Sequence, residues 1–507
     1  MSLASHLVLA FYSGRIKAME RMATQAQAMQ EQQLSRLVAR ARNTQFGQEH
    51  GFDKIKTYAD FVQAVPVTDY EHFAPYVERM LRAEANVTWP GRVKWFAKSS
   101  GTSDAKSKFI PVTDDVLSQC HMQGNKDCIA AYYHQHPETQ CHRGLCLTLG
   151  GSKKISPLGN GLSQTGDLSA IMIGNAPFWS NWFKTPTKDV ALIAEWEDKL
   201  EKITAQTVHQ NVTSLAGVPS WFMVLLKHIM AHEGKQNIQE VWPNLELFIH
   251  GGINFEPYRE QYKAIAPKGL NFLETYNASE GFFALQTDPT NRGLQLMLDL
   301  GVFFEFVPLA EVGQEHPAGA VPIWGVSTGV DYAIVITTCG GLWRYMIGDT
   351  VRFTETAPYK IVISGRTKLY INAFGEELMI GNAEEAMRRA CKATGAVVSD
   401  YTAAPVFMDA AQRGCHQWLV EFQTPPADPE AFGRELDLAL QAVNSDYEAK
   451  RYKDITLAPL ILTVARPNLF VDWLRSHGKL GGQNKVPRLK NDRALIDEML
   501  QMNAQQQ

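Results

Sequence analysis

The 507-residue chain lacks the features of a membrane or secreted protein. No apolar segment approaches the roughly 18 uninterrupted residues that a spanning helix needs. The apolar run at residues 7–12 has no basic residue before it and leads into a charged helical pattern. We therefore expect neither a signal peptide nor a membrane anchor.

The sequence also lacks a large excess of either charge, since it has 49 basic and 53 acidic residues and a net charge of -4. A nucleic-acid or anionic-membrane partner would require a basic surface. We expect neither partner.

Cysteine is scarce, and its seven residues are an odd number without an export signal, which predicts reduced thiols and a cytoplasmic protein. Cysteines and histidines crowd together between residues 120 and 146. None of them forms the Cys-x2-Cys pair that anchors most structural zinc sites. We interpret this region as buried cysteines with surface histidines, and not as a metal site.

The length exceeds that of one hydrophobic core, so at least two domains are expected. Apolar strands followed by helices, between residues 145 and 276, predict an α/β domain, and β-rich runs at residues 301–311 and 330–339 predict an antiparallel subdomain. Residues 365–507 have the pattern and size of a small α+β domain. The predicted fold is a large α/β domain over residues 1–364, with several subdomains, and a small C-terminal domain over residues 365–507.

The loop at residues 98–108 (KSSGTSDAKSK) has the composition of a phosphate site. Short side chains let backbone N–H groups approach phosphate oxygens, hydroxyl groups add donors, and lysine adds charge. The expected donors are Ser99, Ser100, Gly101 and Thr102, with Lys106 or Lys108 adding charge, whereas Asp104 disfavours close backbone contact at its own position. The loop at residues 150–154 (GGSKK) is the main competitor, and we interpret it as a turn.

Two later stretches, residues 274–281 (ETYNASEG) and 343–350 (WRYMIGDT), follow this loop in order. Together the three resemble the signature motifs of the GH3 family of acyl-acid amido synthetases, a branch of the adenylate-forming superfamily. The resemblance extends from residues 66–70 to residues 481–488, nearly the whole chain. It implies an enzyme that uses ATP to convert a carboxylic acid into acyl-AMP and then passes the acyl group to an amine, expected to be an amino acid.

The resemblance also implies roles for single residues. Glu280 would hold Mg²⁺ near the phosphates of ATP, because hard cations prefer oxygen, and Lys485 would reach the α-phosphate from a mobile small domain. Arg366 resembles the arginine that closes the large domain, and Lys368 falls where a hinge is expected. The remaining expected nucleotide contacts are Tyr276 (stacking on adenine), Ser279, and Asp349 (ribose hydroxyls).

The sequence allows two interpretations of the residues that could form an acyl pocket. Apolar residues near the second motif could line a cavity for an aryl or alkyl acid, or could be ordinary core. They are Val218, Trp221, Phe222, Phe282 and Phe283.

Two alternative functions also stay open. A thioester-forming ligase would need a basic patch for the 3′-phosphate of coenzyme A, and no clustered patch is present, which favours the amide. A non-catalytic binding protein would not need Glu280, Asp349 and Lys485 together. We expect a monomer that acts on small molecules.

Overall fold

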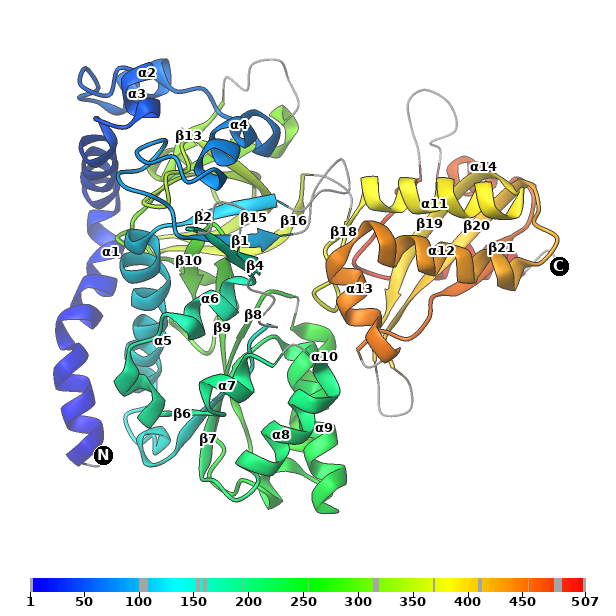
Figure 1. Ribbon diagram of the computed structural model, residues 1–507, viewed down its shortest axis with the longest axis horizontal. Coiled ribbons are helices and arrows are strands. Elements are labelled where there is room, and N and C mark those ends of the chain that lie inside the picture. The colour runs from blue at the N-terminus through cyan, green and yellow to red at the C-terminus, as the bar shows by residue number, and fades with distance from the viewer. Residues whose placement is uncertain are drawn as a thin grey trace.

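The computed structural model describes residues 3–99, 108–151, 156–157, 162–193, 195–253, 255–312, 319–367, 370–408, 413–454, 456–477 and 486–504. A large N-terminal part and a smaller C-terminal part lie side by side, and α1 (Leu3–Ala41) runs along the outer edge of the large part (Figure 1). Among the described residues, no helix is long and apolar enough to cross a membrane.

One sheet of twelve strands, counted over the described residues, organises the large part in the order β13-β12-β14-β15-β16-β11-β10-β9-β8-β7-β3-β6. Its parallel half consists of β6 (Lys184–Thr185), β3 (Leu145–Thr148), β7 (Val212–Gly217), β8 (Leu247–Gly251) and β9 (Asn271–Ala278). Its antiparallel half consists of β10 (Gly281–Leu285), β11 (Leu294–Leu296), β12 (Val302–Pro308), β13 (Val321–Pro322), β14 (Asp331–Thr338), β15 (Tyr345–Thr356) and β16 (Tyr359–Arg366). The β-rich segment predicted after residue 301 is therefore hydrogen-bonded to the α/β segment as one continuous sheet.

A second sheet of the large part has the order β2-β1-β5-β4. Its strands are β1 (Trp95–Ser99), β2 (Lys108–Val112), β4 (Ser156–Pro157) and β5 (Gln164–Gly166). Pro111 cannot donate a ladder hydrogen bond, which predicts an edge strand, and β2 is at the edge. In the sequence, the predicted phosphate loop connects β1 to β2.

The helices of the large part begin and end at recognisable signals. α9 (Pro219–Glu233) starts with proline at its first position and ends at Gly234 in the left-handed conformation. The helical pattern over residues 187–208 predicts one helix, but the structure has two, α7 (Lys188–Ala191) and α8 (Trp196–Thr207). The others are α2 (Gln45–Glu49), α3 (Tyr58–Ala64), α4 (Tyr70–Leu81), α5 (Met122–Gln135), α6 (Leu168–Gly174) and α10 (Glu256–Ile265).

The small part is built on the sheet β19-β20-β21, with α11 and α12 beside it in Figure 1. Side chains alternate along β20: Trp418 and Val420 belong to the core shared with α11 and α12, whereas Leu419 packs with α14 and α15. The bounds are α11 (Ile380–Thr394), β19 (Val397–Val406), β20 (Cys415–Thr424), α12 (Pro429–Val443), α13 (Ser445–Arg451), β21 (Ile461–Ala465), α14 (Leu469–Ser476) and α15 (Ala494–Ala504).

A short hairpin, β17 (Tyr370–Ile371) and β18 (Leu378–Met379), connects the two parts. The carbonyl of Ala373 accepts a hydrogen bond of 2.8 Å from Tyr258, and that of Phe374 accepts one of 3.2 Å from Ser220. Across the same junction, the Lys450 ammonium lies 4.0 Å from the ring centroid of Trp221. The hydrophobic core of the α8–α10 region continues into the small part, so the two parts pack directly in this arrangement.

Candidate active site

The centre of the site is the carboxylate of Asp349 on β15. Asp349 pairs in register with Arg366 on β16, so their side chains are neighbours across the ladder, and the Arg366 Nε donates to Asp349 Oδ1 at 2.7 Å. The other carboxylate oxygen accepts a hydrogen bond of 2.6 Å from the hydroxyl of Tyr276 on β9. Two of the three predicted motifs thus meet at one carboxylate.

This meeting requires a curved sheet. In the strand order, β9 lies four positions from β15, which in a flat sheet would separate them by about 19 Å at about 4.8 Å per strand. The hydrogen bond between Tyr276 and Asp349 shows that the sheet curls until its two motif-bearing strands approach each other. The curl encloses a space between them.

That space is a cavity of about 490 Å³, within the range of sites for small ligands. Residues of the second motif, of β15 and β16, and of the small part form its walls. The lining residues are Lys108, Gly252, Ile253, Phe255, Glu274, Thr275, Tyr276, Asn277, Ala278, Ser279, Glu280, Arg292, Leu294, Ile347, Asp349, Val362, Ile363, Ser364, Gly365, Arg366, Tyr370, Asn372, Ala373, Glu377, Phe407 and Asn491.

Glu280 lies in the turn between β9 and β10 and faces this cavity. Burial raises the pKa of its carboxyl to about 7, and the ammonium of Lys108 opposes that shift. Lys108 is itself only 8% exposed and pairs in register with Ser99 at the base of the phosphate-loop hairpin. The hairpin therefore places one of its two candidate lysines beside the second motif.

The residues present fit a magnesium ion brought by a nucleotide. Among the described residues, no group of three His, Cys, Asp or Glu side chains could hold a metal. Mg²⁺ usually takes one or two protein carboxylates and completes its shell with phosphate and water oxygens. The single carboxylate of Glu280 beside Lys108 matches that arrangement, and the cysteine and histidine region forms no metal site among the described residues.

Two adjacent glycines at the end of β8 allow the cavity wall to pack closely. A Cβ atom on Gly251 would lie 2.4 Å from the carbonyl oxygen of Thr275, and Gly252 has φ +84°, a conformation that favours glycine. Sequence reasoning did not assign this pair to the site. The signal was a glycine pair directly after an apolar strand, where α/β sheets bind their ligands.

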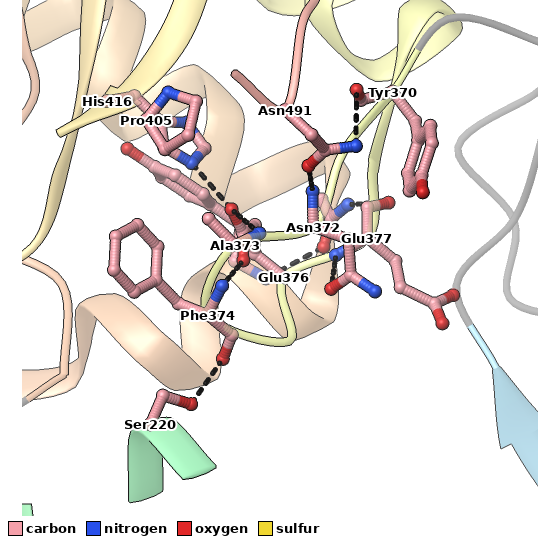
Figure 2. Close-up of polar contacts among 12 residues, drawn as sticks. Ser220, Tyr370, Asn372, Ala373, Phe374, Glu376, Glu377, Pro405, His416 and Asn491 are labelled. Carbon is pink, nitrogen blue, oxygen red and sulfur yellow. Dashed lines mark hydrogen bonds and ion pairs between the residues drawn. The ribbon is translucent and has the colours of Figure 1, made fainter. Parts of the chain in front are cut away.

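The hairpin of the small part supplies a wall that sequence reasoning also missed. Asn372 and Glu377 line the cavity, and Asn372 Nδ2 donates to the Gly252 carbonyl at 3.3 Å. Beneath them the buried Glu376 carboxylate accepts hydrogen bonds from the amides of Ala373 (3.2 Å) and Phe374 (2.7 Å) and contacts His416 Nε2 at 2.8 Å (Figure 2). This cluster fixes the shape of the hairpin turn.

Several predicted residues are placed but not brought into the cavity. Phe222 is fully buried and packs edge-to-face on Phe248, with ring centroids 5.3 Å apart. Phe282 is buried and packs so closely on Gly124 that a Cβ atom there would clash with its ring. Phe283 packs on Tyr276. With Val218 and Trp221, none of these is among the residues that line the described cavity. An acyl pocket at these residues remains a proposal.

Most of the other predicted residues lie outside the part of the chain that the structure describes. Ser99 ends β1, while Ser100, Gly101, Thr102, Asp104 and Lys106 lie outside the described residues. Lys368 and Lys485 also lie outside them, as do residues 152–155 of the competing glycine loop. Gly150, the first residue of that loop, is described, and its carbonyl accepts a hydrogen bond of 2.6 Å from the buried Lys199 ammonium.

The fold resembles that of solved ligases. The acyl acid amido synthetase AtGH3.15 in complex with 2,4-DB aligns with a TM-score of 0.61 at 17% identity, covering 96% of this chain and 95% of that one. A 2-hydroxyisobutyryl-CoA ligase in complex with 2-HIB-AMP and CoA aligns with a TM-score of 0.50 at 13% identity, covering 97% and 93%. These likenesses establish the fold, which is the predicted one.

Family models match most of the chain. The GH3 family N-terminal domain matches residues 15–271, the central domain residues 295–366 and the C-terminal domain residues 381–494. The chain therefore belongs to the GH3 family, as its motifs indicated.

Curated relatives align over nearly the full length. An indole-3-acetic acid-amido synthetase of Oryza sativa subsp. indica is 24% identical, over 94% of this chain and 90% of the relative. A jasmonoyl–L-amino acid synthetase of Oryza sativa subsp. japonica is 23% identical, over 94% of each. A 4-substituted benzoates-glutamate ligase of Arabidopsis thaliana is 21% identical, over 94% and 96%.

Proposed function

We propose that this protein joins a small carboxylic acid to an amine in two steps, with acyl-AMP as the intermediate. The observation that carries the proposal is the Asp349 carboxylate, held between Tyr276 and Arg366 at a cavity that also contains Glu280 and Lys108. Relatives named as indole-3-acetic acid-amido, jasmonoyl–amino acid and benzoates–glutamate ligases support an amino acid as the amine.

In the first step, a carboxylate oxygen of the acid attacks the α-phosphorus of ATP, and pyrophosphate leaves. Two anions must approach each other, so the protein's contribution is position and charge. Asp349 can accept hydrogen bonds from the ribose hydroxyls, and Tyr276 can present its ring to adenine. Lys108, with the phosphate loop that contains Ser99–Thr102, would face the phosphates, together with Lys485 from the small part.

Glu280 would hold Mg²⁺, which when bound neutralises phosphate charge. In the second step, the amine nitrogen attacks the carbonyl carbon of acyl-AMP and gives up a proton, the bond from that carbon to the phosphate oxygen breaks, and AMP leaves. One cavity must enclose ATP and later admit an amine. We therefore propose that residues 370–507 rotate about a joint at residues 365–368 between the steps.

Exchange of labelled pyrophosphate into ATP tests the first step without knowledge of the amine. The acids to try are indole-3-acetate, jasmonate, 4-substituted benzoates and 2-hydroxyisobutyrate. Exchange that depends on one acid and is lost in Asp349→Ala supports the proposal, whereas no exchange with any acid overturns it. Adding amino acids or coenzyme A to an active mixture then separates an amide ligase from a thioester ligase.

All seven cysteines are free thiols, which supports a reducing compartment such as the cytoplasm. We keep the cytoplasmic location and the monomeric state as proposals. Gel filtration coupled to light scattering tests the second of them.

A further inference from the structure

The hairpin that joins the two parts presents two neighbouring glutamates on opposite sides. Glu376 points into the small part, towards His416, whereas the carboxylate of Glu377 extends away from it (Figure 2). Glu377 lines the cavity that also contains Asp349 and Glu280. The same turn therefore fixes one carboxylate in the core and presents the other to the cavity.

The backbone at Glu377 is held in an unusual conformation. Its φ is +38°, in the left-handed region that side chains other than glycine rarely adopt. The amide of Glu377 donates to Asn372 Oδ1 at 3.3 Å, and its carbonyl accepts from Asn444 Nδ2 at 3.2 Å. Such conformations persist only where the surroundings enforce them, and they concentrate at functional sites.

Glu377 is the more distant of two carboxylates that pair with Arg366. Arg366 makes its short ion pair with Asp349, at 2.7 Å, and reaches Glu377 only at 3.4 Å. A carboxylate in a cavity that takes a triphosphate opposes nucleotide binding, because like charges repel. The charge of Glu377 is instead suited to a cation that enters after pyrophosphate has left.

An amine substrate arrives at neutral pH as such a cation. We propose that Glu377 binds the ammonium group of the amine and accepts one proton from it, which frees the nitrogen lone pair for attack on acyl-AMP; this rests on the proposed function. Because Glu377 belongs to the small part, its position in the cavity depends on how that part is oriented. The amine site would then form only in orientations that bring the hairpin to the cavity.

The test compares the wild type with Glu377→Gln, which keeps the side-chain shape and removes the charge. The acid found by pyrophosphate exchange is held at saturation, and amide formation is measured against each of the twenty common amino acids. Glu385→Gln is the matched control, because Glu385 is an ion-paired glutamate on α11 outside the cavity lining. Hydroxylamine, which is uncharged at neutral pH, serves as a second nucleophile.

We expect Glu377→Gln to raise the KM for the amino acid by about 10-fold to 100-fold, the range for losing one hydrogen bond to a charged group. The KM for ATP in pyrophosphate exchange and the rate of hydroxamate formation should change far less. An amino-acid KM that changes no more than in Glu385→Gln overturns the inference, as does an equal rise in the KM for ATP. Wild-type enzyme that makes hydroxamate but accepts no amino acid also overturns it, while absent pyrophosphate exchange refutes the proposed function itself.

Discussion

Replacing Glu376 by alanine should release the hairpin turn that forms one wall of the cavity. The substitution removes a carboxylate that contacts three groups, the amides of Ala373 and Phe374 and the imidazole of His416. The side chains of Glu376 and His416 are both fully buried. Each buried donor left without a partner costs about 1–3 kcal/mol. Because the costs of the three lost contacts overlap, we expect the free energy of opening the turn to fall by about 3–4 kcal/mol.

Hydrogen exchange followed by mass spectrometry measures that opening. At about 1.4 kcal/mol per factor of ten, the amides in a peptide over residues 370–379 should exchange roughly 100-fold to 1,000-fold faster in Glu376→Ala. A peptide over α12 should change little, and Glu385→Ala, which removes exposed ion pairs worth little, should leave the turn protected. An increase of less than about threefold in the turn would refute the argument that Glu376 holds its shape.

Asp349→Ala should weaken ATP binding by about 1.5–3 kcal/mol, the value of a hydrogen bond to a charged group, as measured by calorimetry; unchanged affinity with the fold intact would count against a ribose contact. Burial raises the pKa of Glu280 from 4.5 to about 7. The folded chain then keeps a proton that the unfolded chain has lost, so the ligand-free protein should lose stability as pH rises from about 4.5 to about 7. Thermal melts should show the melting temperature falling over this pH range. If Glu280→Gln showed the same fall, a group other than Glu280 would be its cause. Limited proteolysis should cut near residues 365–368 in the free protein and be slowed by an acyl-adenylate analogue; equal cutting in both states would argue against a moving domain. Lys485→Ala should lower pyrophosphate exchange by about 10²–10³-fold with ATP affinity nearly kept, because its charge would act only as adenylation proceeds. If amide formation from ready-made acyl-AMP fell equally, Lys485 would not be specific to the first step.

The strands and their motifs could be predicted because local patterns determine them. The strands that flank the phosphate loop, the edge position of β2 and the strand that leads into the second motif follow from alternation, proline and composition. The pairing of Asp349 with Arg366 could not be predicted, because register depends on the turn between β15 and β16 and on β-bulges along them. The break between α7 and α8 was missed for a related reason, since helical periodicity continues on both sides of it.

The small-part wall of the cavity was missed because it depends on contacts between distant segments. Asn372 bonds the carbonyl of Gly252, a partner 120 positions away in the chain, and no local pattern encodes such a distance. In β19, alanines and a proline weaken the strand signal, yet the strand forms because β20 offers it a full antiparallel partner. Glu377 gave no signal of its own, since a glutamate next to another glutamate in a polar turn is usually solvated.

The contacts across the junction set the cost of moving the small part. Besides the contacts of Arg366 with Glu377 and Met379, three hydrogen bonds to main-chain carbonyls join the large part to the hairpin: Ser220 donates to Phe374, Tyr258 donates to Ala373, and Asn372 donates to Gly252. At a net value of about 0.5–1.5 kcal/mol each, losing them costs on the order of 3 kcal/mol. A ligand bound at micromolar affinity supplies about 8 kcal/mol, so a modest preference for one orientation is enough to shift the balance. The Glu376–His416 contact lies wholly within the small part and would survive the rotation, and Glu377 would therefore be carried as a preformed unit into or out of the cavity.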